Sequence, residues 1–155
     1  MSEISQRLRD VALQSWHNDL EKNSKLTYYV QFKTLLNVER YITELKEWKL
    51  RNALSRFRIS CHSLNVEVGR RNNIDKEYRL CRYCLSKDLS YVEDEIHFLY
   101  VCKKYTHLRI KFLPELIHVH PDIYHFNRLM CTENYETIVR LSLFICEGFK
   151  EFQDD

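Results

Sequence analysis

The sequence contains very little glycine and proline. Only two residues of each type occur among its 155 residues. Glycine and proline provide most sharp turns, and a sheet of many strands needs such turns between its strands. Their scarcity argues against a many-stranded β-fold and predicts a mainly α-helical chain.

The sequence also lacks long apolar segments. A transmembrane helix needs about 20 consecutive apolar residues, whereas the apolar runs here are only a few residues long. The first twenty residues carry five charged side chains, so they have no apolar core of a signal peptide. We expect an intracellular protein of the nucleus or cytoplasm, with no membrane partner and with cysteines that are mostly reduced.

Recognisable catalytic motifs are missing as well. The chain has no glycine-rich phosphate loop, no Gly-x-Ser-x-Gly nucleophile motif and no carboxylate pair in a known catalytic pattern. We therefore expect no enzymatic activity and no small-molecule substrate.

One group of residues has the spacing of a metal site. Two cysteines are separated by two residues, twelve residues later a histidine follows, and after four more residues comes a third cysteine; these are Cys81, Cys84, His97 and Cys102. A Cys-x-x-Cys turn directs both sulfur atoms into one concavity, and the intervening loop is long enough to return as a short hairpin. Three thiolates and one imidazole form a closed tetrahedral shell that suits a single structural zinc ion.

Two other interpretations of these cysteines exist. They are ordinary buried cysteines, or Cys81 and Cys84 form a redox pair, which would follow a strand at the start of a helix in a βαβ unit; no such unit is apparent. The acidic run before His97 suits the first turn of a helix, so we expect His97 and Cys102 near the two ends of one short helix. The remaining cysteines are expected to be small buried apolar residues: Cys61, Cys131 and Cys146.

Around the ligands, the sequence resembles the zinc-binding segment found C-terminal to the reverse transcriptases of animal non-LTR retrotransposons. The similar positions are Arg79-Leu80-Cys81-Arg82-Tyr83-Cys84, Glu93-Asp94-Glu95-Ile96-His97-Phe98-Leu99-Tyr100-Val101-Cys102, Tyr105 and Leu108-Arg109. Upstream, the positions that resemble the animal members are Leu54-Ser55-Arg56-Phe57-Arg58, Ser60, His62, Leu64, Val66-Glu67 and Gly69-Arg70. The likeness covers roughly half of the chain.

This resemblance implies a zinc module that helps a polymerase to hold template RNA or target DNA. The metal-binding aspartates of a polymerase palm and an endonuclease domain are absent, so the resemblance implies the tail of such a polyprotein or a stand-alone relic. The chain departs from the usual proline-rich form where Arg82 follows Cys81 and Lys103 follows Cys102.

Charge is distributed unevenly. Residues 46–82 hold ten basic side chains against four acidic ones, whereas residues 112–155 hold three against eight. Helical spacing predicts that Arg51, Ser55, Arg58 and His62 share one outward face. We predict weak binding to nucleic-acid phosphates through six arginines: Arg51, Arg58, Arg70, Arg71, Arg79 and Arg82. The alternative is that these arginines only keep a helix surface solvated.

We expect a helical domain with an inserted zinc knuckle, made of a hairpin and a helix. Residues 1–75 form an N-terminal helical region, residues 76–113 the zinc-binding module, and residues 114–155 a C-terminal helical region. The C-terminal region should pack back on the N-terminal helices in one compact unit. A helix over about 48–61 is expected to turn Leu50, Ala53, Leu54 and Phe57 inward, and the final helix should run from about 135 to 152. The segment 25–36 fits a strand and a helix equally well.

Two functions fit these features. The first is a nucleic-acid-binding zinc module, as the resemblance implies. The second is a protein-interaction or purely structural module, in which zinc replaces a missing core.

Overall fold

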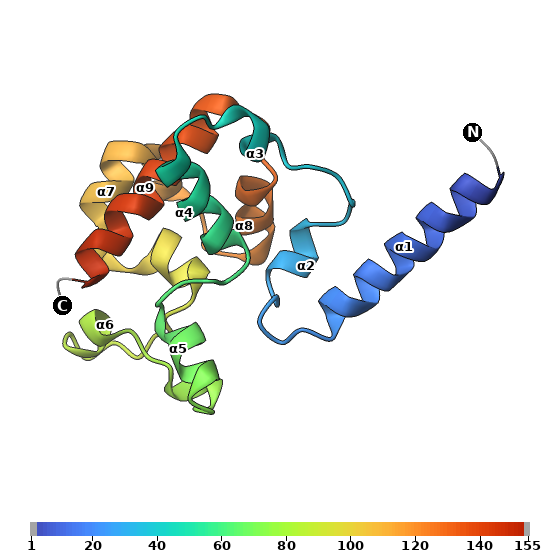
Figure 1. Cartoon of the computed structure of the whole chain (residues 1–155). Helices are drawn as coiled ribbons and strands as arrows, with labels where there is room; N and C mark the ends of the chain where they lie inside the picture. Colours follow the sequence, from blue (N-terminus) through green and yellow to red (C-terminus); the bar gives the residue numbers. More distant parts are fainter. Residues whose placement is uncertain (1–2, 154–155) are drawn as a thin grey trace.

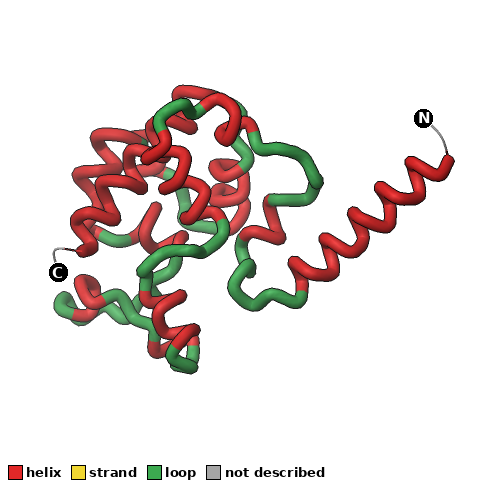
Figure 2. Tube along the Cα trace, viewed as in Figure 1, coloured by secondary structure: helices red, strands yellow, loops and turns green. Residues whose placement is uncertain are grey.

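The computed structural model describes residues 3–153, and in that range helices joined by loops make up the fold (Figures 1 and 2). The α-helices are α1 (Glu3–Glu21), α2 (Tyr29–Phe32), α3 (Arg40–Glu44), α4 (Trp48–Arg58), α5 (Asn65–Arg71), α6 (Arg82–Leu85), α7 (Thr106–Phe112), α8 (Ile123–Met130) and α9 (Tyr135–Gln153). Shorter helical turns are η1 (Lys76–Tyr78), η2 (His97–Val101), η3 (Lys103–Tyr105) and η4 (Pro114–His118). No β-strand occurs among residues 3–153, which confirms the mainly α fold class.

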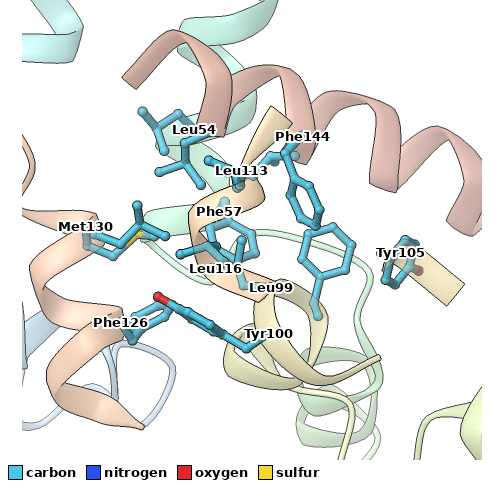
Figure 3. Packing of buried hydrophobic residues seen from close by; sticks show 14 of the residues in the cluster. Leu54, Phe57, Leu99, Tyr100, Tyr105, Leu113, Leu116, Phe126, Met130 and Phe144 are labelled. Carbon is cyan, nitrogen blue, oxygen red and sulfur yellow. The ribbon is translucent and has the colours of Figure 1, made fainter. Parts of the chain in front are cut away.

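The long helix α9 is at the centre of the packing. It lies against α4 and α7 and also contacts α3 (Figure 1). Its buried residues follow helical spacing: Ile138, Leu141 and Ile145 are each at most 3% exposed. From α4, the expected residues Leu50, Leu54 and Phe57 face the same core. Phe57 and Phe144 both pack on Phe98, with ring centroids 5.8 and 5.3 Å from it. Figure 3 shows them in one cluster with Leu99, Leu113 and Leu116.

Helix α1 stands apart from this core. It extends away from the other helices and meets α2 near its C-terminal end (Figure 1). Ile4, Leu8 and Val11 form an apolar stripe at helical spacing on its N-terminal half, and each is at least 66% exposed. The C-terminal helix α9 packs on α3 and α4 of the N-terminal region, whereas α1 extends away from these helices. The apolar stripe of α1 is therefore open to solvent. The ambiguous segment 25–36 contains one helical turn, α2, between loops.

The prediction that Arg58 lies on an outward basic face of α4 is wrong. This side chain is 4% exposed, and its guanidinium carbon lies 4.6 Å from the centre of the Phe32 ring. It pairs with Glu39 at 3.1 Å and donates to the Met130 carbonyl. The ion pair and ring contacts compensate for burial of the charge. His62 is also buried, because the chain leaves α4 in a left-handed turn at Ser60 (φ 51°) and runs inward.

A close contact explains why glycine occupies position 148 in the middle of α9. A Cβ atom there would lie 2.6 Å from Cζ of Phe98, a ring with no exposed surface. Glycine costs about 1 kcal/mol relative to alanine inside a helix. The packing of Phe98 against the bare helix backbone offsets that cost.

We therefore expect Gly148→Ala to lower the free energy of unfolding by about 1–3 kcal/mol, because overpacking outweighs the gain in helix propensity. Urea denaturation followed by circular dichroism measures the change. In a Phe98→Leu background, which makes room for the methyl group, the same substitution should cost clearly less. An equal cost in both backgrounds would contradict the contact as its cause.

Candidate metal centre

The knuckle is built on a short antiparallel hairpin. The backbone amide of Cys81 donates to the Tyr91 carbonyl at 2.8 Å, and the amide of Glu93 donates to the Arg79 carbonyl at 2.9 Å. These bonds flank an isolated bridge between Leu80 and Val92. The one-turn helix α6 begins directly after Cys81 and ends one residue after Cys84. Hairpin and helical turn together direct both sulfur atoms to one side, as the Cys-x-x-Cys spacing predicts.

The other two ligands lie at the ends of a π-helical turn, η2: His97 is its first residue, and Cys102 caps its C-terminus. The amide of Cys102 donates to the carbonyl of His97, five residues earlier, at 2.8 Å. In an α-helix, residues five positions apart point about 140° away from each other. The wider π turn brings His97 and Cys102 onto the same side instead, and such turns are common at functional sites. His97 and Cys102 thus occupy the two ends of one short helical turn, as predicted from the sequence.

Three of the six distances between the four ligand atoms have the spacing expected around a metal ion. The Sγ atom of Cys102 lies 3.8 Å from Sγ of Cys81 and 3.9 Å from Sγ of Cys84, and Nε2 of His97 lies 3.4 Å from Sγ of Cys84. Zinc bonds of about 2.3 Å to sulfur and 2.0–2.1 Å to nitrogen give tetrahedral edges of about 3.8 Å between two sulfurs and about 3.5 Å between sulfur and nitrogen. The observed distances match these edges.

The thiols repel one another when ionised. A hydrogen bond from Cys102 lowers the pKa of Cys81 to about 3. Hydrogen bonding to Cys81 and burial raise the pKa of Cys102, and burial together with the charge on Cys81 raises the pKa of Cys84. At neutral pH the cluster alone therefore holds one thiolate, and three thiolates require a cation between them.

All four residues are buried, and their ligand atoms lie within 4.8 Å of one another. They form a group that can hold one metal ion, and its sulfur and imidazole donors favour zinc. If Nε2 of His97 binds the metal, Nδ1 carries the proton. That atom is buried without a hydrogen-bond partner in the described part of the chain, and the ring is held by stacking on Tyr91 at 5.4 Å between centroids.

Each residue of the acidic run before His97 has a different structural task. Asp94 accepts from the amide of His97 at 2.8 Å, and so caps the ligand turn. Its other oxygen accepts from the hydroxyl of Tyr28, also at 2.8 Å, which ties the turn to the N-terminal region. Glu93 accepts from the amide of Asn65 at 2.9 Å, and burial raises its pKa to about 8.

Glu95 is buried and accepts from Ser60 at 2.6 Å and from Nε2 of His62 at 2.9 Å. Burial alone would raise the pKa of Glu95, but these hydrogen bonds and the His62 charge leave it below its ordinary value. His62 is therefore a core residue that supports the turn behind His97, and it is not placed at the surface as expected.

Arg109 is a supporting residue whose role sequence reasoning missed. Its guanidinium is buried and donates to the carbonyl of Cys102 at 2.6 Å and to the hydroxyl of Thr106 at 3.0 Å. A second nitrogen approaches the Leu99 carbonyl at 3.4 Å. Carbonyls at the end of η2 lack partners within the helix, so Arg109 satisfies them and positions Cys102. An arginine seven residues after a ligand carries no pattern that would distinguish it from a surface charge.

The cysteines outside the cluster are less buried than expected. Cys61 and Cys146 are half-buried, and Cys131 is exposed. The interpretation of Cys131 as a core residue is wrong, because α8 ends at Met130 and the chain turns outward after it.

The six arginines predicted to bind nucleic acid do not form one surface. Arg71 and Arg82 are exposed, and Arg58 is buried. The other three are half-buried and have protein partners. Arg51 donates to the Leu45 carbonyl at 2.8 Å, Arg70 pairs with Glu67 at 2.9 Å, and Arg79 donates to the carbonyls of Val66 and Ile74.

Comparison with known proteins identifies no family for the chain, because no protein-family model, no curated protein and no solved structure matches it. Within residues 3–153, no helix combines the length and apolar character needed to cross a bilayer.

We expect the purified protein to bind one zinc ion per chain and Cys84→Ser to lose it. Structural zinc contributes on the order of 10–16 kcal/mol in small finger peptides, so this variant should melt the knuckle and η2. Metal content is measured by atomic emission. Because two of the three thiols are protonated without metal, zinc binding should release about two protons, measured by calorimetry in buffers of different ionisation enthalpy.

The matched control is Cys131→Ser, which removes an exposed thiol outside the cluster. Zinc content should not change in this variant. Stoichiometric zinc in Cys84→Ser, or none in the wild type, would disprove the assignment.

We expect Arg109→Met to destabilise the zinc-loaded protein by about 1–3 kcal/mol, since the Cys102 carbonyl loses its donor while staying buried. Its zinc affinity should fall too, as measured by competition with a chromophoric chelator. Lys111→Met removes the same charge from an exposed position of α7 and should have little effect. Equal effects of both substitutions would refute the positioning role.

Proposed function

We propose that this chain is a non-catalytic module, held together by one structural zinc ion, that binds the phosphate backbone of nucleic acid. The observation that carries the structural part is the closed Cys3His group. Four protein ligands complete a tetrahedral shell and leave no position for a reactive water molecule, unlike the three-ligand sites of zinc enzymes. The resemblance to the zinc segment of retrotransposon reverse transcriptases supports the same interpretation.

The position of the exposed arginines supports nucleic-acid binding. Arg82 lines a hollow of about 250 Å³ beside the knuckle, together with Ser63. Ser63 also lines a second, larger hollow, whose wall includes Arg71. The two hollows thus adjoin, and both carry basic side chains. Arginine forks bind phosphate oxygens in bidentate fashion, and a fixed backbone beneath them lowers the entropic cost of binding.

The remaining predicted arginines contribute less in this proposal. The guanidinium groups of Arg51 and Arg79 donate to backbone carbonyls, and that of Arg70 pairs with Glu67. Arg58 is buried and takes no part. Phosphate contact therefore falls mainly to Arg71 and Arg82.

A second candidate is a protein-interaction module. The open stripe formed by Ile4, Leu8 and Val11 on α1 favours it, because a projecting amphipathic helix is a common means of contacting another protein. In that case zinc would serve the fold alone.

We expect weak binding that falls steeply with salt, since phosphate contacts release counterions. The double substitution Arg71→Ala/Arg82→Ala should flatten the log–log salt dependence by about 1.4–1.8, at about 0.7–0.9 per contact, and leave zinc content unchanged. Electrophoretic shift assays with single- and double-stranded RNA and DNA measure this. No shift with any of the four at low salt would decide for the protein-interaction module.

A further inference from the structure

The larger of the two hollows lies along α4 and α9, two helices that run side by side (Figure 1). It has a volume of about 840 Å³ and is closed at one side by the segment from Cys61 to Ser63 and by Arg71. Lys49, Ala53 and Arg56 face it together, because they are spaced four and three residues apart on α4. We refer to this hollow as the α4–α9 groove.

The charged side chains that line the groove are all basic. They are Lys49, Arg56, Arg71 and Lys150, and among residues 3–153 no aspartate or glutamate lines it. Lys150 pairs with Glu147 at 2.6 Å, so it adds little net charge. Arg56 donates its Nε to the Cys61 carbonyl at 3.0 Å, which fixes the guanidinium at the rim. Burial raises the pKa of the groove residue Cys146, and Glu147 and Glu47 add to this, so both carboxylates lie near the groove. With Lys150 paired to Glu147, Lys49, Arg56 and Arg71 leave the groove a net positive charge that suits an anionic chain.

Aromatic rings provide the accessible apolar surface of the groove. Trp48 is 65% exposed at the first position of α4, and Phe149 is half-buried. Phe57 and Ile145, in the floor, are at most 1% exposed, so the floor is already filled by the core. A long aliphatic side chain of a bound peptide would find no deep pocket there, whereas a flat ring can stack on the indole.

The geometry points to the α4–α9 groove as a binding site for single-stranded nucleic acid, in which a base stacks on Trp48 and phosphates contact Lys49, Arg56 and Arg71. This inference rests on the proposed function and specifies its ligand. A basic groove with an exposed aromatic ring is the combination used by proteins that hold unpaired strands. Bases inside a duplex are already stacked on each other and do not reach such a ring.

The test uses the zinc-loaded full chain and labelled homopolymers of about a dozen nucleotides, oligo(U) and oligo(dT), compared with duplexes of the same length. Fluorescence anisotropy at low salt should show tighter binding of the single strands. Trp48→Ala should weaken their binding by about 5- to 100-fold, whereas Trp48→Phe, which keeps a ring, should restore part of it. Lys49→Ala/Arg56→Ala should flatten the salt dependence by about 1.4, at about 0.7 per contact.

Lys22→Ala/Arg128→Ala is the matched control, because it removes two exposed positive charges outside the groove. Its affinity for single strands should stay close to that of the wild type. Trp48, Lys49 and Arg56 are themselves exposed, so zinc content and circular dichroism should confirm that all variants are folded.

Three outcomes would overturn the inference. If Arg71→Ala/Arg82→Ala weakens binding but the Trp48 and Lys49/Arg56 variants bind as the wild type does, the groove is not the site and the proposed function stands. If no nucleic acid binds, both fail. If an acidic amphipathic peptide binds in a Trp48-dependent way and no oligonucleotide does, the groove is a peptide site.

Discussion

The structure depends on the balance of charge within one buried cluster. Three thiols and an imidazole lie within 4.8 Å of one another, and the pKa of Cys81 is lowered while those of Cys84 and Cys102 are raised, so ionisation of one thiol opposes ionisation of the other two. A divalent metal would remove this conflict and join three short elements that have little cohesion of their own: the hairpin bridge, α6 and the π turn η2. A single bridge and two single helical turns would not be stable in isolation.

The cluster is also joined to the helical core through neighbouring residues. Phe98, next to the ligand His97, packs its ring at 5.3 Å from Phe144 and against the bare backbone at Gly148. On the other side of η2, Arg109 of α7 binds the Cys102 carbonyl, and Tyr28 binds Asp94. The cluster and the core therefore support each other, and a metal bound by the cluster would also stabilise the packing of α7 and α9.

The ligands could be predicted from the sequence because a tetrahedral shell imposes short, fixed spacings on residues close in the chain. The inward residues of α4 and α9 followed from helical periodicity in the same way. The π turn could not be predicted, since a His-x4-Cys spacing fits several local conformations. Nor could the burial of Arg58 and Arg109, because their partners are the distant Glu39 and the backbone carbonyls of Met130 and Cys102, which no local pattern reveals.

The same limit explains why counting charges overstated the basic surface. The excess of positive charge over residues 46–82 is real in the sequence, but folding uses part of it internally. Arg58 is buried in the core and packs on the ring of Phe32. Arg79 donates hydrogen bonds that join the knuckle to α5, and Arg70 forms an ion pair with Glu67. Part of the positive charge that remains at the surface comes from Lys49 and Arg56, which did not stand out in the sequence. Helical spacing on α4 brings both into one groove beside Trp48. Charged side chains form a binding surface only where they have no partner inside the protein and line a groove that fits the ligand.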